Sequence, residues 1–245
     1  DGTDAILVAS KIEAIAEGTF NASSNATSLV FSTANSEAAG SAGVMTFTSG
    51  GTLKIKDANT SDGSSPTITL QTGDTDIAQD DVLGQIDFQA PDEGTGTDAI
   101  LVASTIKAFS EGDFSSSNNA TTLELSTGRS AAAGSDGGRM RLTSAGVLEL
   151  KNQNTADDSF PTITLQTGDT DIAQDDVLGR ILFQAPDEGT GTDAITASAR
   201  IQAFSTGDFS SSSNATGLEL RTASSAAVGT AGDGTSLTLL PDNQL

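Results

Sequence analysis

The chain repeats itself, and this constrains its fold more than any other feature. Residues 66–100 read PTITLQTGDTDIAQDDVLGQIDFQAPDEGTGTDAI, and the same segment returns 95 residues later at 161–195. The two copies differ only at Gln85/Arg180 and Asp87/Leu182. A long repeat of this kind indicates several units of one architecture, each of which needs its neighbours to complete a core.

Shorter matches extend the repeat toward the start of the chain. Residues 2–6 match 96–100, and Phe20 matches Phe114 and Phe209. We therefore expect part of one unit in residues 1–65, a complete unit in 66–160 and a third, incomplete unit in 161–245. Because the chain starts at Asp1, an internal segment of a longer protein is expected.

Comparison of the copies exposes the strands. Alternate positions from 6 to 14 hold small or apolar residues in every copy, whereas the positions between them change charge, as Lys11, Thr105 and Arg200 do. A period of two with one constant face is typical of a half-buried β-strand. The same alternation recurs around residues 29–31, 45–47, 53–55, 68–70 and 86–88 and in their later copies.

This pattern predicts about six short strands per unit, joined by Gly-, Ser-, Asn-, Asp- and Pro-rich turns. No segment has a helical period. The expected fold is all-β, an elongated repeat fibre of short antiparallel strands.

Each strand offers only two or three large apolar residues on one face. A single chain would therefore form a thin sheet with one apolar side, which association must cover. Small residues such as Ala14, Ala108 and Ala203 permit close approach to an axis. We expect a homotrimer of β-prism-like or intertwined β units, since closed symmetry also hides strand edges.

Composition excludes several classes of function. The chain has no Cys, His, Trp or Tyr, so it lacks disulfides, thiol nucleophiles, imidazole bases and the usual zinc ligands. Its formal net charge of −22 repels nucleic acid and anionic membrane surfaces. No apolar run approaches the roughly 18 residues that a membrane-spanning helix needs.

Residues 70–127 resemble repeats in tail fibre and appendage proteins of marine bacteriophages. The resemblance lies in the stretches DVLGQIDFQAPDE (81–93), DAILVASTIKAFSEG (98–112) and LELST (123–127). It implies a trimeric, elongated β shaft on the virion. Its partners would be copies of itself, other virion tail proteins and a host surface receptor, the last bound through a tip outside this segment.

An acidic loop, residues 73–81, is repeated at 168–176. One interpretation is a Ca²⁺ loop, since Ca²⁺ takes several oxygen ligands. The other is a solvated turn in which Asp side chains cap backbone amides, and the spacing, which differs from an EF-hand, favours it. The candidate ligands are Asp74, Asp76, Asp80, Asp81, Asp169, Asp171, Asp175 and Asp176. No other cofactor is expected.

Adjacent carboxylates at residues 91–94 and 186–189 could suggest glycoside hydrolysis, but that chemistry needs two acids about 5–10 Å apart across a sugar. Neighbours in a Pro–Gly turn do not imply that geometry, so we expect no catalytic residues and no enzyme. Phe20, Phe114 and Phe209 fit core positions better than sugar-stacking platforms.

The favoured function is a structural shaft segment of a phage tail fibre or virion appendage, which spaces a receptor-binding tip from the virion for host attachment. The alternative is the repeat region of a bacterial or archaeal surface adhesin or extracellular filament. A polysaccharide depolymerase is the third hypothesis.

Overall fold

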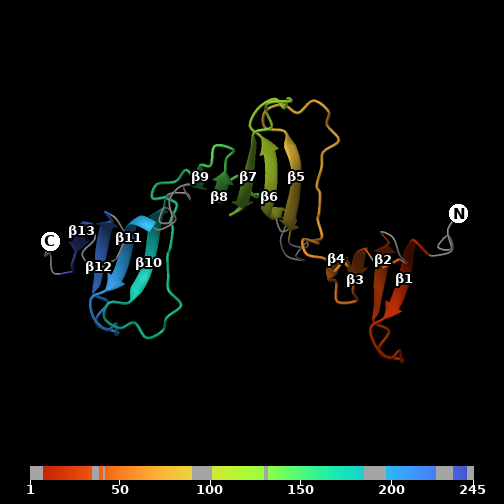
Figure 1. Cartoon of the computed structure of the whole chain (residues 1–245), viewed down its shortest axis with the longest axis horizontal. Helices are drawn as coiled ribbons and strands as arrows, with labels where there is room; N and C mark the ends of the chain where they lie inside the picture. The colour runs from red at the N-terminus through yellow and green to blue at the C-terminus, as the bar shows by residue number, and fades with distance from the viewer. Residues whose placement is uncertain are drawn as a thin grey trace. The chain divides into compact units, whose positions relative to one another are not determined.

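The computed structural model describes residues 8–34, 39–40, 42–89, 101–129, 132–184, 197–224 and 234–241. In this part of the chain all elements are strands, thirteen in number, and none is a helix (Figure 1). No helix there could cross a membrane. The fold is all-β and every strand pair is antiparallel, as the sequence predicts.

The strands form three sheets, and in each sheet the strands lie side by side in chain order. The first sheet holds β1 (Ser10–Ala16), β2 (Thr27–Thr33), β3 (Gly43–Phe47) and β4 (Leu53–Asp57). The second holds β5 (Val82–Gln89), β6 (Val102–Ser110), β7 (Thr121–Thr127), β8 (Gly138–Leu142) and β9 (Leu148–Asn152). The third holds β10 (Val177–Gln184), β11 (Ala197–Ser205), β12 (Thr216–Thr222) and β13 (Ser236–Leu239).

The chain divides into two compact units, residues 1–155 and 156–245, so the third sheet belongs to the second unit. Strand pairing is the same in each sheet. Ile12 faces Phe31 in the first sheet, Ile106 faces Leu125 in the second, and Ile201 faces Leu220 in the third. The three sheets are therefore copies of one meander, and the second is the most complete.

Glycine shapes the tight turns of these meanders. The β3–β4 turn closes through Gly51, whose N–H donates to the Thr48 carbonyl at 3.0 Å, and the β8–β9 turn closes through Gly146 and Thr143 at 2.9 Å. Gly51 has φ +80° and Gly146 has φ +76°. This left-handed conformation is strained for residues with a Cβ, so glycine is required at both positions.

The predicted strand around residues 68–70, with its copy at 163–165, is wrong. This segment is extended but has no strand pairing, and β5 begins only at Val82. It runs alongside the second sheet (Figure 1), where Leu70 approaches Gly84 of β5. Alternating Ile68 and Leu70 therefore mark an extended segment that packs against the sheet by side chains.

The close approach requires Gly84. A Cβ at this position would lie 2.7 Å from the Leu70 Cβ and 3.2 Å from the Leu70 carbonyl oxygen. Gly179 and Leu165 repeat the arrangement with the same distances. The repeat therefore preserves a glycine for packing.

We expect Gly84→Ala to destabilise residues 1–155 by about 1–2 kcal/mol, because overpacking displaces Leu70 and outweighs the lower entropy of the unfolded chain. Urea unfolding measures the change. Gly73→Ala is the matched control, since a Cβ there would meet nothing within 4 Å. Equal stability of the two variants would contradict the packing role of Gly84.

Candidate functional site

The central strand β7 of the second sheet exposes its apolar side chains and buries its polar ones. Along β7, Thr122, Glu124 and Ser126 are buried, whereas Leu123 and Leu125 are 43% and 37% exposed. The alternation that the sequence predicts is confirmed. In a single chain, however, the apolar set is the one in contact with water.

Strand register aligns the apolar and small residues of this face into rows, most of whose large side chains are exposed. The rows are Ile12–Phe31–Met45–Ile55 and Ala14–Leu29–Phe47–Leu53 in the first sheet, Ile86–Ile106–Leu125–Met140–Leu150 and Gly84–Ala108–Leu123–Leu142–Leu148 in the second, and Ile181–Ile201–Leu220–Leu237 and Gly179–Ala203–Leu218–Leu239 in the third. We call these rows the apolar face.

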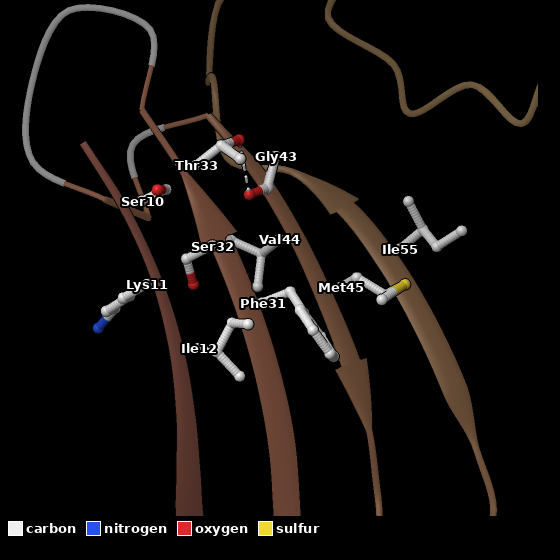
Figure 2. Close-up of a pocket in the computed structure, with 10 residues that line it drawn as sticks. All are labelled: Ser10, Lys11, Ile12, Phe31, Ser32, Thr33, Gly43, Val44, Met45 and Ile55. Carbon is white, nitrogen blue, oxygen red and sulfur yellow. Dashed lines mark hydrogen bonds between the residues drawn. The ribbon is translucent and has the colours of Figure 1, made fainter.

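Figure 2 shows one row of this face in the first sheet, where β1 to β4 contribute one side chain each: Ile12, Phe31, Met45 and Ile55. These side chains line an open groove of about 670 Å³. Ile12 is 68% exposed. Contiguous apolar surface of this kind is rare on monomeric proteins and marks interaction sites, so the apolar face is the candidate functional surface.

The opposite face of the second sheet carries a ladder of charges. Register places Lys107, Glu124, Arg141 and Glu149 on neighbouring strands. The Glu124 side chain is only 4% exposed; its Oε2 accepts from Arg141 Nε at 2.6 Å, and its Oε1 lies 3.5 Å from Lys107 Nζ. Arg139 pairs with Glu149 at 2.9 Å. Arg139 Nε lies 4.0 Å from Glu124 Oε2. A buried carboxylate is tolerated here because three cations surround it.

Phe109 contacts two cations of this ladder. Its side chain is buried, and both Lys107 Nζ and Arg141 Cζ lie over the ring, at 5.3 Å and 5.0 Å from its centroid. Cation–π contact holds both cations near Glu124.

The ladder differs between the sheets, whereas the equivalent positions of the apolar face stay apolar or small in all three. In the third sheet Arg200 Nη2 binds Glu219 Oε2 at 2.7 Å. In the first sheet Val30 occupies the position of Glu124, and Lys11 pairs with Glu13 on the same strand at 2.6 Å. The residues of the polar face can therefore differ between sheets, because their charges are compensated within each sheet.

In the first and second sheets, one glutamate joins two turns by accepting hydrogen bonds from residues distant in the sequence. We call this residue the glutamate clamp. Glu111 accepts hydrogen bonds from Thr122 Oγ1 at 2.6 Å and from the N–H and Oγ of Ser144 at 2.8 and 2.5 Å. Glu17 makes the same bonds with Ser28 and Ser49. In the third sheet Thr206 stands in this position.

These hydrogen bonds lower the pKa values of the two glutamates. The hydrogen bond from Ser144 and then that from Thr122 lower the pKa of Glu111, and those from Ser28 and Ser49 lower the pKa of Glu17. Burial raises the pKa of Glu124, but Arg141 and Lys107 outweigh it and the pKa lies below its ordinary value. All three carboxylates are thus engaged by residues of their own sheet.

The acidic loops dock onto strand ends. Asp81 Oδ2 accepts from the Ala78 N–H at 2.8 Å, and Asp74 Oδ1 accepts from the Asp76 N–H at 2.9 Å. Asp80 has φ +71°. Ser110, with no exposed surface, donates to the Ala78 carbonyl and accepts from the Asp81 N–H at 3.0 Å. Asp169, Asp171, Asp175, Asp176 and Ser205 repeat the geometry.

In the described part of the chain, no three acidic side chains converge into a group that could hold a metal ion. The Ca²⁺ loop stays a prediction. The adjacent carboxylates at 91–94 and 186–189 lie outside the described residues. Phe114 and Phe209 are half-buried, and Phe20 is 55% exposed.

We expect Glu124→Gln to lower the free energy of unfolding by about 1–3 kcal/mol, because it leaves Lys107 and Arg141 without their shared anion. Chemical denaturation measures the loss. Glu149→Gln is the control: its carboxylate is 42% exposed, and its change should stay within about 0.5 kcal/mol. Similar losses in both variants would contradict the central role of Glu124.

Acid should unfold the protein through these carboxylates. Because their folded pKa values are lowered, the stabilisation is complete above the ordinary value of 4.5. It is lost as pH falls through the lowered values. Melting temperature against pH, from 7 downward, measures this loss. Glu111→Gln should flatten the decline below 4.5; an unchanged slope would exclude the clamp as a contributor.

We expect a chelator to leave the melting temperature unchanged, because Asp74 and Asp81 already cap backbone amides. Melting with and without EDTA, and with added Ca²⁺, tests this. A fall in EDTA that Ca²⁺ reverses would instead establish the Ca²⁺ loop, and Asp76→Asn should then remove the response.

No family model and no curated protein matches the chain. Two solved structures of the carboxy-terminal domain of the bacteriophage T5 L-shaped tail fibre are similar to it. The one with its intra-molecular chaperone domain is 14% identical over 76% of this chain and 60% of that chain, with a TM-score of 0.30. The other is 16% identical over 76% and 87%, also with a TM-score of 0.30.

Proposed function

We propose that the chain is a structural shaft segment of a phage tail fibre or virion appendage. It lies outside the host cell and spaces a receptor-binding tip from the virion. The observation that carries this proposal is the apolar face, which recurs in the same register in three sheets and is exposed in each. The resemblance of residues 70–127 to marine phage fibre repeats supports the assignment to a virion.

Copies of the chain cover the apolar face in this proposal. Identical copies carry identical rows, so one symmetric arrangement buries every sheet at once. Ala14, Ala108 and Ala203 occupy the same row position in the three sheets, where their small side chains allow neighbouring backbones to approach. A homotrimer of β-prism-like or intertwined units satisfies these requirements.

In this proposal the shaft supplies length and stiffness, because each repeat adds one more unit of the same fold. Its other partners are virion tail proteins and, through a tip outside this segment, a host surface receptor. We propose no enzymatic activity. The carboxylates with altered pKa, Glu17, Glu111 and Glu124, are bound by Ser, Thr, Lys and Arg of their own sheets, which is a structural use.

A surface adhesin would use the same architecture, and the gene separates the two hypotheses. Neighbouring tail genes favour the phage fibre, whereas a secretion signal and a membrane anchor favour the adhesin. Purified protein should release no sugar from bacterial capsule; release of oligosaccharides would establish the depolymerase instead.

Analytical ultracentrifugation and electron microscopy of the purified chain test the shaft directly. We expect a trimer by mass that appears as a thin rod. A folded monomer at micromolar concentration would contradict the proposal.

Leu125→Asp should dissociate the oligomer, because Leu125 is the middle member of its row on the apolar face and burial of a charge there without a partner is costly. Sedimentation measures the mass, and circular dichroism should still show β structure, since Leu125 is 37% exposed in the single chain. Ser117→Asp, in an exposed turn, is the control and should leave the mass unchanged. An intact oligomer in Leu125→Asp would exclude this face as the interface.

A further inference from the structure

A pocket lies on the polar face of the second sheet, on the side opposite to the apolar rows. Its volume is about 370 Å³, at the small end of the roughly 300–1,000 Å³ that ligand pockets span. Two rows of side chains from β5 to β8 form its floor: Gln85–Lys107–Glu124–Arg141 and Asp87–Thr105–Ser126–Arg139. We call it the polar pocket. The ion pairs of Glu124 account for one row of its floor but assign no role to the space above.

Small side chains in the second row create this space. Thr105 and Ser126 face each other on β6 and β7, and their hydroxyl oxygens lie 2.8 Å apart. In the third sheet the same two positions hold Arg200 and Arg221, which also face each other and pair with Glu219. The polar pocket therefore results from the residues chosen in the second sheet and is not imposed by the repeated fold.

The loop between β7 and β8 forms one wall of the polar pocket. The Ala133 N–H donates to the Val102 carbonyl at 2.8 Å, and Gln153 Nε2 donates to the Gly134 carbonyl at 2.7 Å. Gly134 lies over the floor, since a Cβ there would be 3.5 Å from Ser126 Oγ. These bonds attach the loop to β6 and to the residue after β9, so the fold itself holds the wall in place.

The lining carries both signs of charge in nearly equal number. It contains the cations Lys107, Arg139 and Arg141 and the carboxylates Asp87 and Glu124. The carboxylates oppose an anionic ligand, the three cations oppose a cationic one, and an apolar ligand would leave all five groups without partners. A neutral ligand rich in hydroxyl groups fits both sets, because each hydroxyl can donate one hydrogen bond and accept others.

Several lining groups retain hydrogen-bonding capacity. The Lys107 ammonium carries three donors and lies 3.5 Å from Glu124 Oε1. Asp87 is exposed and accepts from Gln85 Nε2 at 3.0 and 3.1 Å, which leaves lone pairs for further donors. Arg139 Nε is buried and has no hydrogen-bond acceptor in the part of the chain that the structure describes. Because buried donors are nearly always paired, this nitrogen points to an acceptor from outside the sheet.

We propose that the polar pocket binds one neutral sugar ring, either as a free monosaccharide or as one residue of a glycan. Lys107 and Arg139 donate to oxygens of the ring, Asp87 accepts from its hydroxyls, and the loop at Gly134 limits the site to a single ring. The pocket lies within the second sheet, on the face opposite to the apolar rows. The inference therefore holds whether or not the chain forms a shaft, and it includes no catalytic step.

Saturation-transfer difference NMR of the intact chain tests the proposal, with glucose, galactose, mannose and N-acetylglucosamine as probes. We expect at least one of these sugars to bind in a saturable way. Short oligosaccharides of that sugar then separate the two sources of the ring: equal or tighter binding assigns a glycan residue, and loss of binding assigns a free monosaccharide. Absence of saturable binding by all four sugars, or tighter binding of inorganic phosphate or glycine, would overturn the proposal.

Thr105→Arg gives the second sheet the residue that the third sheet carries at this position, Arg200. It should weaken binding of the sugar at least about tenfold, because the guanidinium fills the pocket and faces Asp87, whose acceptors it would occupy. Ser117→Arg adds the same charge in an exposed turn and should leave binding unchanged. Circular dichroism and sedimentation verify that both variants fold and assemble as the original chain does. Unchanged binding in a folded Thr105→Arg chain would contradict the assigned site.

Lysine labelling provides a second measurement that uses the unaltered chain and so does not depend on the folding of a variant. The Lys107 side chain is 28% exposed and open to acetylation, and a bound sugar should slow its modification, measured by mass spectrometry. Lys54, which is exposed on the first sheet, is the internal reference and should react at an unchanged rate. Equal slowing of both lysines, or an unchanged rate at Lys107 under saturating sugar, would show that the sugar binds elsewhere and would overturn the proposal.

Discussion

The structure depends on one constraint: a single antiparallel layer can satisfy its backbone hydrogen bonds but can cover only one of its faces. Cross-strand bonds complete each meander internally, and on β7 the polar side chains are buried. Most Ile, Leu, Met and Phe side chains of the apolar rows are exposed to water in the single chain. Since burial of apolar surface is the dominant favourable term in folding, the stability of such a sheet is decided by what lies against this face.

The polar face shows how an acidic chain accommodates its charge. Of the 33 acidic residues, Glu124 lies buried between Lys107 and Arg141, and Glu17 and Glu111 collect hydroxyl and amide donors. These contacts hold turns onto strands within a sheet. They do not require the same residues in every repeat, which explains why Glu124 is replaced by Val30 in the first sheet while the apolar rows are kept.

Comparison of the repeats predicts the strands and their faces because burial and backbone pairing impose the same period of two on every copy. The comparison wrongly predicts a strand at Ile68 and Leu70. In this extended segment apolar and polar residues alternate because Leu70 packs against Gly84, and the segment pairs with no strand. It also misses Ser110 and Glu111, since a serine at a strand end and a glutamate beside a glycine have no distinctive spacing. Their roles depend on hydrogen bonds to Ala78 and Ser144, which are distant in the sequence.

The chain-order meander has a consequence for biogenesis. Every strand in a sheet pairs with the strand next to it in the chain, so loop closure is short and the secondary structure of one repeat can form while later repeats are still being synthesised. In the proposed oligomer, by contrast, the apolar rows are covered only when separate chains meet, so their coverage depends on chain concentration. In such an assembly, nascent repeats form their strands before their apolar rows are covered. Translation of several chains from one messenger RNA keeps those chains close during that interval and favours assembly over aggregation.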